Sequence, residues 1–335
     1  MPGMPMMTLP FRTTRRTVLA AAALAAPARA QEAYPSRPVT ITVPWAPGGS
    51  TDILARTLAE PLRLALGQPV VVENRSGASG NIGSAAVARA APDGHSLLFA
   101  TMSTHAMNAA LMRDMPFDGV EDFTAIALLA FVLNTMVIHP AVPARTVPEF
   151  IAHLKANPGR LSFGSPGVGQ SPHLTGVWFN QATGTQAIHV PFRGAGPAAM
   201  ELVAGNINYM WDNLTSGIQQ IRGGRVRALA VSSADRNPQL PDVPAARETM
   251  PELAKFDVNT WFGIFLPAAT PRPIAESLNA AMKAWHGTEE VQARWREMGG
   301  VSLYGSTTEF AAFVSNEVEK WGEVIRKEGL QLEVG

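Results

Sequence analysis

The sequence has no cysteine among its 335 residues. This absence excludes disulfide frameworks, thiolate nucleophiles, cysteine-ligated zinc, iron–sulfur clusters and a lipidated N-terminal cysteine. An excess of charge is also missing, because 27 Lys and Arg face 27 Asp and Glu, which argues against a strongly basic nucleic-acid binder. Beyond the first thirty residues, the longest apolar run, 125–133, is too short to cross a bilayer, which takes about 20 residues. It is typical of a buried strand.

Motifs for bond-making chemistry are scarce. The sequence contains neither a G-x-S-x-G elbow nor an H-E-x-x-H motif, and its seven histidines include no pair four residues apart. We therefore expect no catalytic residues, no metal ion and no cofactor. One catalytic alternative stays open, in which Ser171, His173 and Asp212 serve an exported α/β hydrolase or lyase. Helix capping explains Ser171 and Asp212 at least as well.

The first thirty residues have the pattern of an export signal. Arg12, Arg15 and Arg16 precede the apolar run 18–26, and Ala28-Arg29-Ala30 is a small-x-small cleavage site. The paired arginines favour the twin-arginine route, and a Sec signal is the alternative. Cleavage after Ala30 would leave 23 basic and 27 acidic residues, a net charge of −4. We expect the mature chain in the periplasm.

The rest of the chain alternates between strand and helix patterns. Strands are predicted at 39–43, 70–73, 96–100, 161–163, 187–190, 207–211, 227–231 and 261–266. Capping boxes at Thr146…Glu149 and Ser306…Glu309 open two of the helices. Such alternation indicates an α/β protein with a parallel sheet covered on both faces.

The length of the mature chain indicates two lobes, because single cores rarely grow past about 250–300 residues. We predict that residues 31–138 and 253–335 form lobe 1 and that residues 139–252 form lobe 2. The apolar segments 131–138 and 261–266 are candidate crossings between the lobes. Two crossings would form a hinge beside an interlobe cleft.

Five loops follow predicted strands, where α/β folds collect their ligand contacts. They are 44–52, 74–83, 101–105, 164–173 and 190–197, and they are rich in glycine, hydroxyl and amide groups. The loop 44–52 leads directly into a helix, whose free N–H groups and partial positive charge suit an anion. The second loop matches neither a dinucleotide-binding nor a Walker A motif. A tight turn without a ligand explains the first loop equally well from its local pattern.

Several loop residues are candidates for ligand contact. Arg193 is the cation that could clamp a carboxylate with a bidentate fork, whereas pairing with a surface acid would make it unimportant. Trp45 and Phe192 are candidate pocket walls, although core residues would look the same. The remaining polar and glycine candidates outside the first two loops are Ser103, Thr104, His105, Ser165, Gly169, Gln170, Ser171, His173, Gly194 and Asp212.

The loops resemble those of a known family. The segment Pro44-Trp45-Ala46-Pro47-Gly48-Gly49-Ser50-Thr51-Asp52 is similar to the first-loop signature of the Bug family, the extracytoplasmic receptors of tripartite tricarboxylate transporters. The segments 74–83, 164–169, 190–194, 240–244 and 261–263 are also similar to family segments, in order along the chain. The resemblance implies a type II periplasmic-binding-protein fold, in which two α/β lobes close on a small carboxylate.

The resemblance also implies site residues and a function. Carboxylate-holding roles carry over to Ala46, Gly48, Gly49, Thr51, Asp52, Ser79 and Asn81, while Gln170 departs from the Ser that is frequent there. The expected ligand is a di- or tricarboxylate, an acidic amino acid or an aromatic acid, captured without catalysis for a membrane permease. We expect a monomer that binds no nucleic acid. A binding protein that serves signalling is the further alternative.

Overall fold

A computed structural model describes residues 34–327, together with residues 3 and 329. The described residues from Tyr34 to Lys327 belong to one compact unit. The expected signal segment, with its cleavage position after Ala30, lies outside the described residues. In the part of the chain that the structure describes, no helix has both the length and the apolar character needed to cross a membrane.

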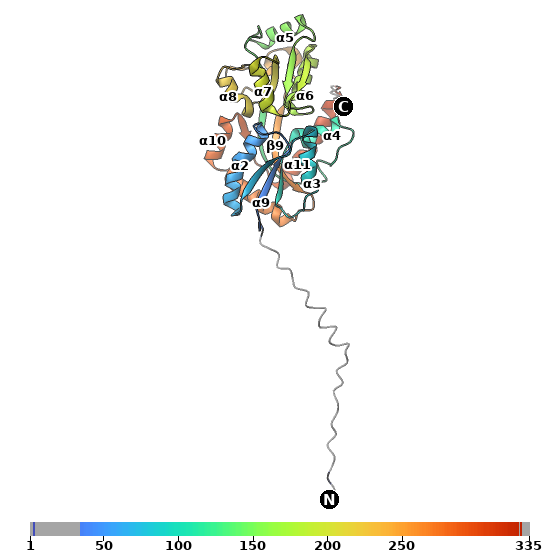
Figure 1. Cartoon of the computed structure of the whole chain (residues 1–335), viewed down its shortest axis with the longest axis vertical. Coiled ribbons are helices and arrows are strands. Elements are labelled where there is room, and N and C mark those ends of the chain that lie inside the picture. Colours follow the sequence, from blue (N-terminus) through green and yellow to red (C-terminus); the bar gives the residue numbers. More distant parts are fainter. Residues whose placement is uncertain (1–2, 4–33, 328, 330–335) are drawn as a thin grey trace. The chain divides into compact units, whose positions relative to one another are not determined.

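Strands and helices alternate along the chain (Figure 1). The first elements are β1 (Val39–Val43), α2 (Ser50–Leu66), β2 (Val70–Asn74), η1 (Ala78–Gly80), α3 (Asn81–Ala88), β3 (Ser96–Thr101), the π-helical turn η2 (Ser103–Met107), α4 (Asn108–Leu111) and β4 (Phe123–Ile138). The next are α5 (Val147–Ala156), β5 (Ser162–Ser165), α6 (Ser171–Thr183), β6 (Ile188–Pro191), α7 (Ala195–Ala204), β7 (Tyr209–Asn213), α8 (Leu214–Arg222) and β8 (Arg227–Val231). The last are η3 (Ala246–Glu248), η4 (Pro251–Leu253), β9 (Asn259–Pro267), α9 (Arg272–His286), α10 (Glu289–Glu297), β10 (Gly300–Ser302) and α11 (Thr307–Lys327).

Side-chain caps mark the starts of two helices. The capping box at the start of α11 forms as expected, because Glu309 N–H donates to Ser306 Oγ and Ser306 N–H donates to Glu309 Oε2. At α5 only half of the box forms, since Glu149 accepts from the N–H of Arg145. The sequence did not predict η2 and β10, because both are too short to show a helical or strand periodicity of apolar residues.

The strands form one sheet with the order β2-β1-β3-β9-β4-β7-β5-β6, and β8 and β10 also pair with β4. Pairing is parallel between β1 and both β2 and β3, and between β5 and both β6 and β7. The expectation of a parallel sheet is wrong for its middle: β4 lies antiparallel to β7, β8 and β10, and β9 lies antiparallel between β3 and β4. The reason is topological: β9 returns from the second half of the chain, so it enters the sheet in the opposite direction.

Strand β4 joins two groups of strands. Its residues as far as Leu133 pair with β9, whereas Asn134 and the residues after it pair with β7. We call β1, β2, β3, β9, β10 and the start of β4 the first strand group. The second strand group comprises β5 to β8 and the end of β4. The junction of the groups therefore lies between Leu133 and Asn134, and the lobe boundaries predicted at 138/139 and 252/253 stay a prediction.

Alternate residues of the strands face opposite cores, as the two-residue period of a strand requires. On β3, Phe99 belongs to the core shared with α2 and α9, while Leu98 belongs to the core shared with α3 and α11. On β7, Trp211 faces α5 and α6, and Met210 faces α7. Helices thus cover both faces of each strand group, which leaves the loops at the strand ends free to form a site (Figure 1).

Candidate functional site

A pocket of about 380 Å³ lies where loops of the two strand groups meet, and we call it the loop pocket. Its volume is in the range of small-molecule sites, roughly 300–1,000 Å³. The loops after β1 and β2 form one wall, and the loops after β5 and β6 form the other. The lining residues are Trp45, Ala46, Ser76, Gly77, Ala78, Ser79, Pro166, Gly167, Val168, Gln170, Phe192, Arg193 and Gly194.

The first loop is braced from behind by Asp52. Its Oδ2 accepts from the N–H of Gly48, and its Oδ1 accepts from Asn74 Nδ2, both at 3.0 Å. Arg56 pairs with the same carboxylate at 2.9 Å. Although burial acts to raise the pKa of Asp52, these hydrogen bonds and the Arg56 charge hold it below its ordinary value. The ionised carboxylate of Asp52 therefore holds the first loop in its conformation. It does not line the loop pocket.

The second loop adopts a backbone conformation that disfavours its residue types. Ala78 has φ 44° and Ser79 has φ 54°, in the left-handed region, which costs non-glycine residues of order 1–3 kcal/mol each. From this position Ser79 Oγ donates to the carbonyl of Val168 at 2.7 Å, so it joins the two walls. Next to it, Gly80 packs so closely on Trp45 and Thr104 that a Cβ would lie within 3 Å of both side chains.

The loop after β5 is held by its own polar groups. Ser165 is fully buried, and its Oγ lies 2.7 Å from Nε2 of His189 and accepts from the N–H of Gly167. Gln170 folds back, donating from Nε2 to the Pro166 carbonyl at 2.9 Å. Gly169 N–H donates to Nδ1 of His173. Only Gln170 of the predicted residues in this loop lines the loop pocket.

The loop after β6 contributes Phe192, Arg193 and Gly194 to the pocket. Among the described residues of the lining, Arg193 is the one cation; its side chain is exposed and has no hydrogen bond or ion pair within the described chain. Gly194, with φ 125°, comes so close to the first loop that a Cβ would lie 2.9 Å from Ala46 Cβ. The two walls are thus in contact at this edge.

Helix N-termini converge on the loop pocket. Gln170 and Gly194 are the N-cap residues of α6 and α7, and both line the pocket, while α2 begins after the N-cap Gly49. None of the three caps has a side-chain hydrogen bond to its helix. Helix N-termini present N–H donors and partial positive charge, so together with Arg193 they suit an anionic ligand.

The predicted residues 103–105 lie in the core beneath the pocket. Ser103 Oγ accepts from the N–H of Ser171 at 2.9 Å, and Thr104 Oγ1 bonds to the backbone of Thr101. His105 packs among aromatic rings, with its centroid 4.1 Å from that of Phe265. Burial lowers the pKa of His105 to about 3, so the ring is neutral. None of these three side chains lines the loop pocket.

The structure does not bring Ser171, His173 and Asp212 into a triad. Ser171 Oγ accepts from Asn134 Nδ2 at 2.9 Å and from Thr260 Oγ1 at 2.8 Å. His173 stacks on His189, and the carboxylate of Asp212 accepts from Ser216 Oγ. Within the described chain, each of the three groups has partners outside the set, and no hydrogen bond links one to another.

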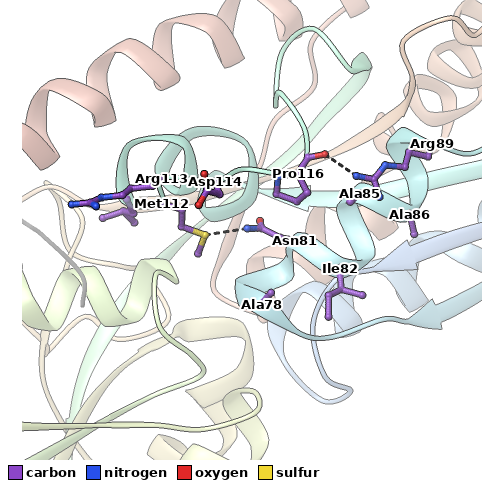
Figure 2. Close-up of a pocket in the computed structure, with 11 residues that line it drawn as sticks. Ala78, Asn81, Ile82, Ala85, Ala86, Arg89, Met112, Arg113, Asp114 and Pro116 are labelled. Carbon is purple, nitrogen blue, oxygen red and sulfur yellow. Dashed lines mark hydrogen bonds between the residues drawn. The ribbon is translucent and has the colours of Figure 1, made fainter. Parts of the chain in front are cut away.

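Two further predicted residues lie at the margin. Thr51 is buried in the first turn of α2, and Asn81 faces a separate groove of about 820 Å³ along α3 (Figure 2). The predicted set omitted six lining residues: Ser76, Gly77, Ala78, Pro166, Gly167 and Val168. All six belong to loops that had already been identified from the sequence. The glycines and polar groups of a loop therefore predicted where the pocket lies, but not which residues of the loop point into it.

Comparisons with known proteins identify the family of the chain. The family model for the tripartite tricarboxylate transporter family receptor (TctC) matches residues 54–330. The UPF0065 protein of the tcbD-tcbE intergenic region of Pseudomonas sp. (strain P51) is 38% identical over 93% of this chain and 94% of its own length. Protein BugT of Bordetella pertussis is 34% identical over 94% of this chain and 96% of its own length.

Solved structures are similar over nearly the whole chain. Rpa4515 of R. palustris with adipate is 32% identical, covers 88% of this chain and 98% of its own, and has a TM-score of 0.85. MatC (Rpa3494) from Rhodopseudomonas palustris with bound malate is 33% identical, covers 87% of this chain and 100% of its own, and has a TM-score of 0.82. The periplasmic binding protein BugD is 34% identical, covers 89% of this chain and 99% of its own, and has a TM-score of 0.85, so the fold is that of the periplasmic binding proteins.

Proposed function

Because the chain belongs to the tripartite tricarboxylate transporter family of receptors, we propose that it captures a small organic carboxylate in the loop pocket and delivers it to a membrane permease. The observation that carries this proposal is the lining of the pocket. Loops from both strand groups contribute to it, two helix N-caps border it, and the exposed guanidinium of Arg193 is its cation.

Ligand capture would couple to closure of two lobes. We place lobe 1 at 31–138 and 253–335 and lobe 2 at 139–252, with the segments 131–138 and 261–266 as the crossings between them. Only a ligand that contacts both walls favours the closed state over the open one. The hydrogen bond from Ser79 to Val168 and the contact of Gly194 with Ala46 belong to that closed state.

The ligand class follows from the charges of the pocket. Adipate and malate, which two similar proteins hold, each carry two carboxylates. We assign one carboxylate to the backbone N–H groups of the first two loops and the other to Arg193. A second cation is absent from the described lining, so a dicarboxylate fits the charge better than a tricarboxylate does.

The protein acts as a binding protein rather than an enzyme. The hydroxyl of Ser171, the ring of His173 and the carboxylate of Asp212 are each engaged elsewhere, so the hydrolase alternative lacks an assembled nucleophile. We also propose export through the signal in residues 1–30, with cleavage after Ala30 and function as a periplasmic monomer.

The test is a binding screen of residues 31–335 by thermal shift and calorimetry. Succinate, malate, adipate, citrate, glutamate and benzoate are compared with butyrate and with the uncharged succinamide. A dicarboxylate should raise the melting temperature increasingly with concentration, since about 100-fold excess over Kd stabilises by about 2.7 kcal/mol. Succinamide should not change the melting temperature. NMR spectra should show that the acid remains chemically unchanged after incubation with the protein.

Arg193→Gln sharpens the screen. This variant should bind the best dicarboxylate about 10-fold more weakly, equivalent to about 1.4 kcal/mol, and its affinity for butyrate should not change. Arg225→Gln removes an exposed arginine from the turn after α8 and is the matched control. If no acid stabilises the protein, or if a product accumulates with time, carboxylate capture without catalysis is contradicted.

A further inference from the structure

The second loop of the pocket is held from behind by a side chain that does not line the pocket. Asn108, the first residue of α4, is completely buried. Its Nδ2 donates to the carbonyl of Ser79 at 3.0 Å and to Oδ1 of Asn81 at 2.9 Å. Both amide hydrogens of Asn108 are therefore used on residues within or just after η1.

These contacts fall where the backbone most needs support. Ala78 and Ser79 are the only non-glycine residues with positive φ in the described chain. Such conformations persist only when the surrounding structure over-determines them. The bond from Asn108 fixes the Ser79 carbonyl directly, and the bond to Asn81 fixes the residue that follows η1.

The opposite side of this support faces the groove along α3. Figure 2 shows Asn81 pointing toward Met112 across that groove, and its Nδ2 lies 3.0 Å from Met112 Sδ. Ala78 lines both the groove and the loop pocket, so η1 is a thin wall between them. Asn81 thus lies on the groove side of this wall and does not line the loop pocket.

We propose that Asn108 is a positioning residue for ligand binding: it holds Ser79 in the conformation from which its hydroxyl reaches the Val168 carbonyl and closes the loop pocket. The inference rests on the proposed function and adds a residue remote from the ligand to it. Without Asn108, Ser79 relaxes toward ordinary φ values, and the 2.7 Å bond across the pocket is lost.

The test is a double-mutant cycle with Ser79→Ala, Asn108→Ala and the double variant, titrated with the dicarboxylate that binds the wild type best. Each single variant should weaken Kd about 10-fold, or about 1.4 kcal/mol. The double variant should be no weaker than either single one, because Asn108 acts through Ser79. Additive losses, or an Asn108→Ala variant that binds as the wild type does, would overturn the proposal.

Asn180→Ala is the matched control. Asn180 is also a buried asparagine, but its Oδ1 accepts from Tyr209 in a core remote from the loop pocket. It should lower the unfolding free energy and leave Kd unchanged, which separates positioning from general stability. If Asn108→Ala does not fold, Asn108→Ser, which keeps one donor, should give the same non-additivity with smaller losses. Failure of the wild type to bind any acid would instead contradict the proposed function.

Discussion

The side-chain amide of Asn134 donates to the hydroxyl of Ser171 at 2.9 Å, which ties the strand β4 to the first residue of α6. Thr260 on β9 donates to the same hydroxyl, and Asn213 on β7 donates to both Asn134 Oδ1 and Thr260 Oγ1. This buried network lies at the junction of the two strand groups. We therefore interpret the Ser171 hydroxyl as a structural group at this junction rather than as a nucleophile.

Ser171→Ala should therefore lower the stability of the fold without abolishing any catalytic activity. It removes the acceptor of two buried donors, so we expect the unfolding free energy to fall by about 1–3 kcal/mol in denaturant titrations. Ser315→Ala, on the outer side of α11, should change it by less than about 0.5 kcal/mol. A Ser171→Ala variant of wild-type stability would contradict this assignment.

The stacked rings of His173 and His189, with centroids 3.8 Å apart, should make stability depend on pH. Burial, aided by the charge of His189, lowers the pKa of His173 to about 3, and burial lowers the pKa of His189 to about 4. Between these values and about 6.5, the unfolded chain binds more protons than the folded chain, so stability falls as the pH falls through this window.

His189→Gln keeps a partner for Ser165 and removes one titrating ring. The loss of unfolding free energy between pH 6.5 and 4.5 should become shallower, by at most about 1.4 kcal/mol per pH unit for one proton. Denaturant titrations at pH 4.5, 5.5, 6.5 and 7.5 measure this slope. An unchanged slope would show that the pair does not carry the acid sensitivity.

Asp212 should act in the opposite direction. Burial raises its pKa to about 7, and hydrogen bonds from Ser216 and the Asn213 backbone only partly offset this. Between about pH 4 and 7 the folded chain keeps a proton that the unfolded chain has lost, so this group destabilises the fold increasingly as the pH rises. Asp212→Asn should therefore gain stability over the wild type from pH 5 to pH 8. Ser216→Ala removes a hydrogen bond that lowers the pKa of Asp212, so it should extend the loss of stability to higher pH. Parallel curves for all three proteins would refute the assignment.

Gly194→Ala should block complete closure. At φ 125° an alanine is strained, and its Cβ would lie 2.9 Å from Ala46 Cβ on the opposite wall. We expect dicarboxylate affinity to fall at least about 10-fold in calorimetry, equivalent to about 1.4 kcal/mol. Gly196→Ala is the control, because a Cβ there meets nothing within 4 Å and its φ is not positive. Equal affinities for the two variants would argue against the closed contact.

The sequence by itself determined the local elements and the loops that matter. The strand β1 lies at the predicted residues, the capping box at Ser306 forms, and all lining residues of the loop pocket belong to loops identified from glycines and polar groups after strands. These features depend on short-range chemistry, namely side-chain period, caps and turn residues, which neighbouring letters express directly.

The tertiary structure alone decided which side of each loop a residue faces and in which direction β9 enters the sheet. Asp52 and Asn81 lie behind the walls, His105 lies in an aromatic core, and Asn108, whose sequence context carries no motif, holds Ser79 from a distance of 29 residues. Side-chain orientation in a loop has no period, and contacts between distant segments form only when both strand groups pack. The sequence was therefore enough to identify the loops of the pocket, whereas the packing of distant segments determined which residues of those loops line it.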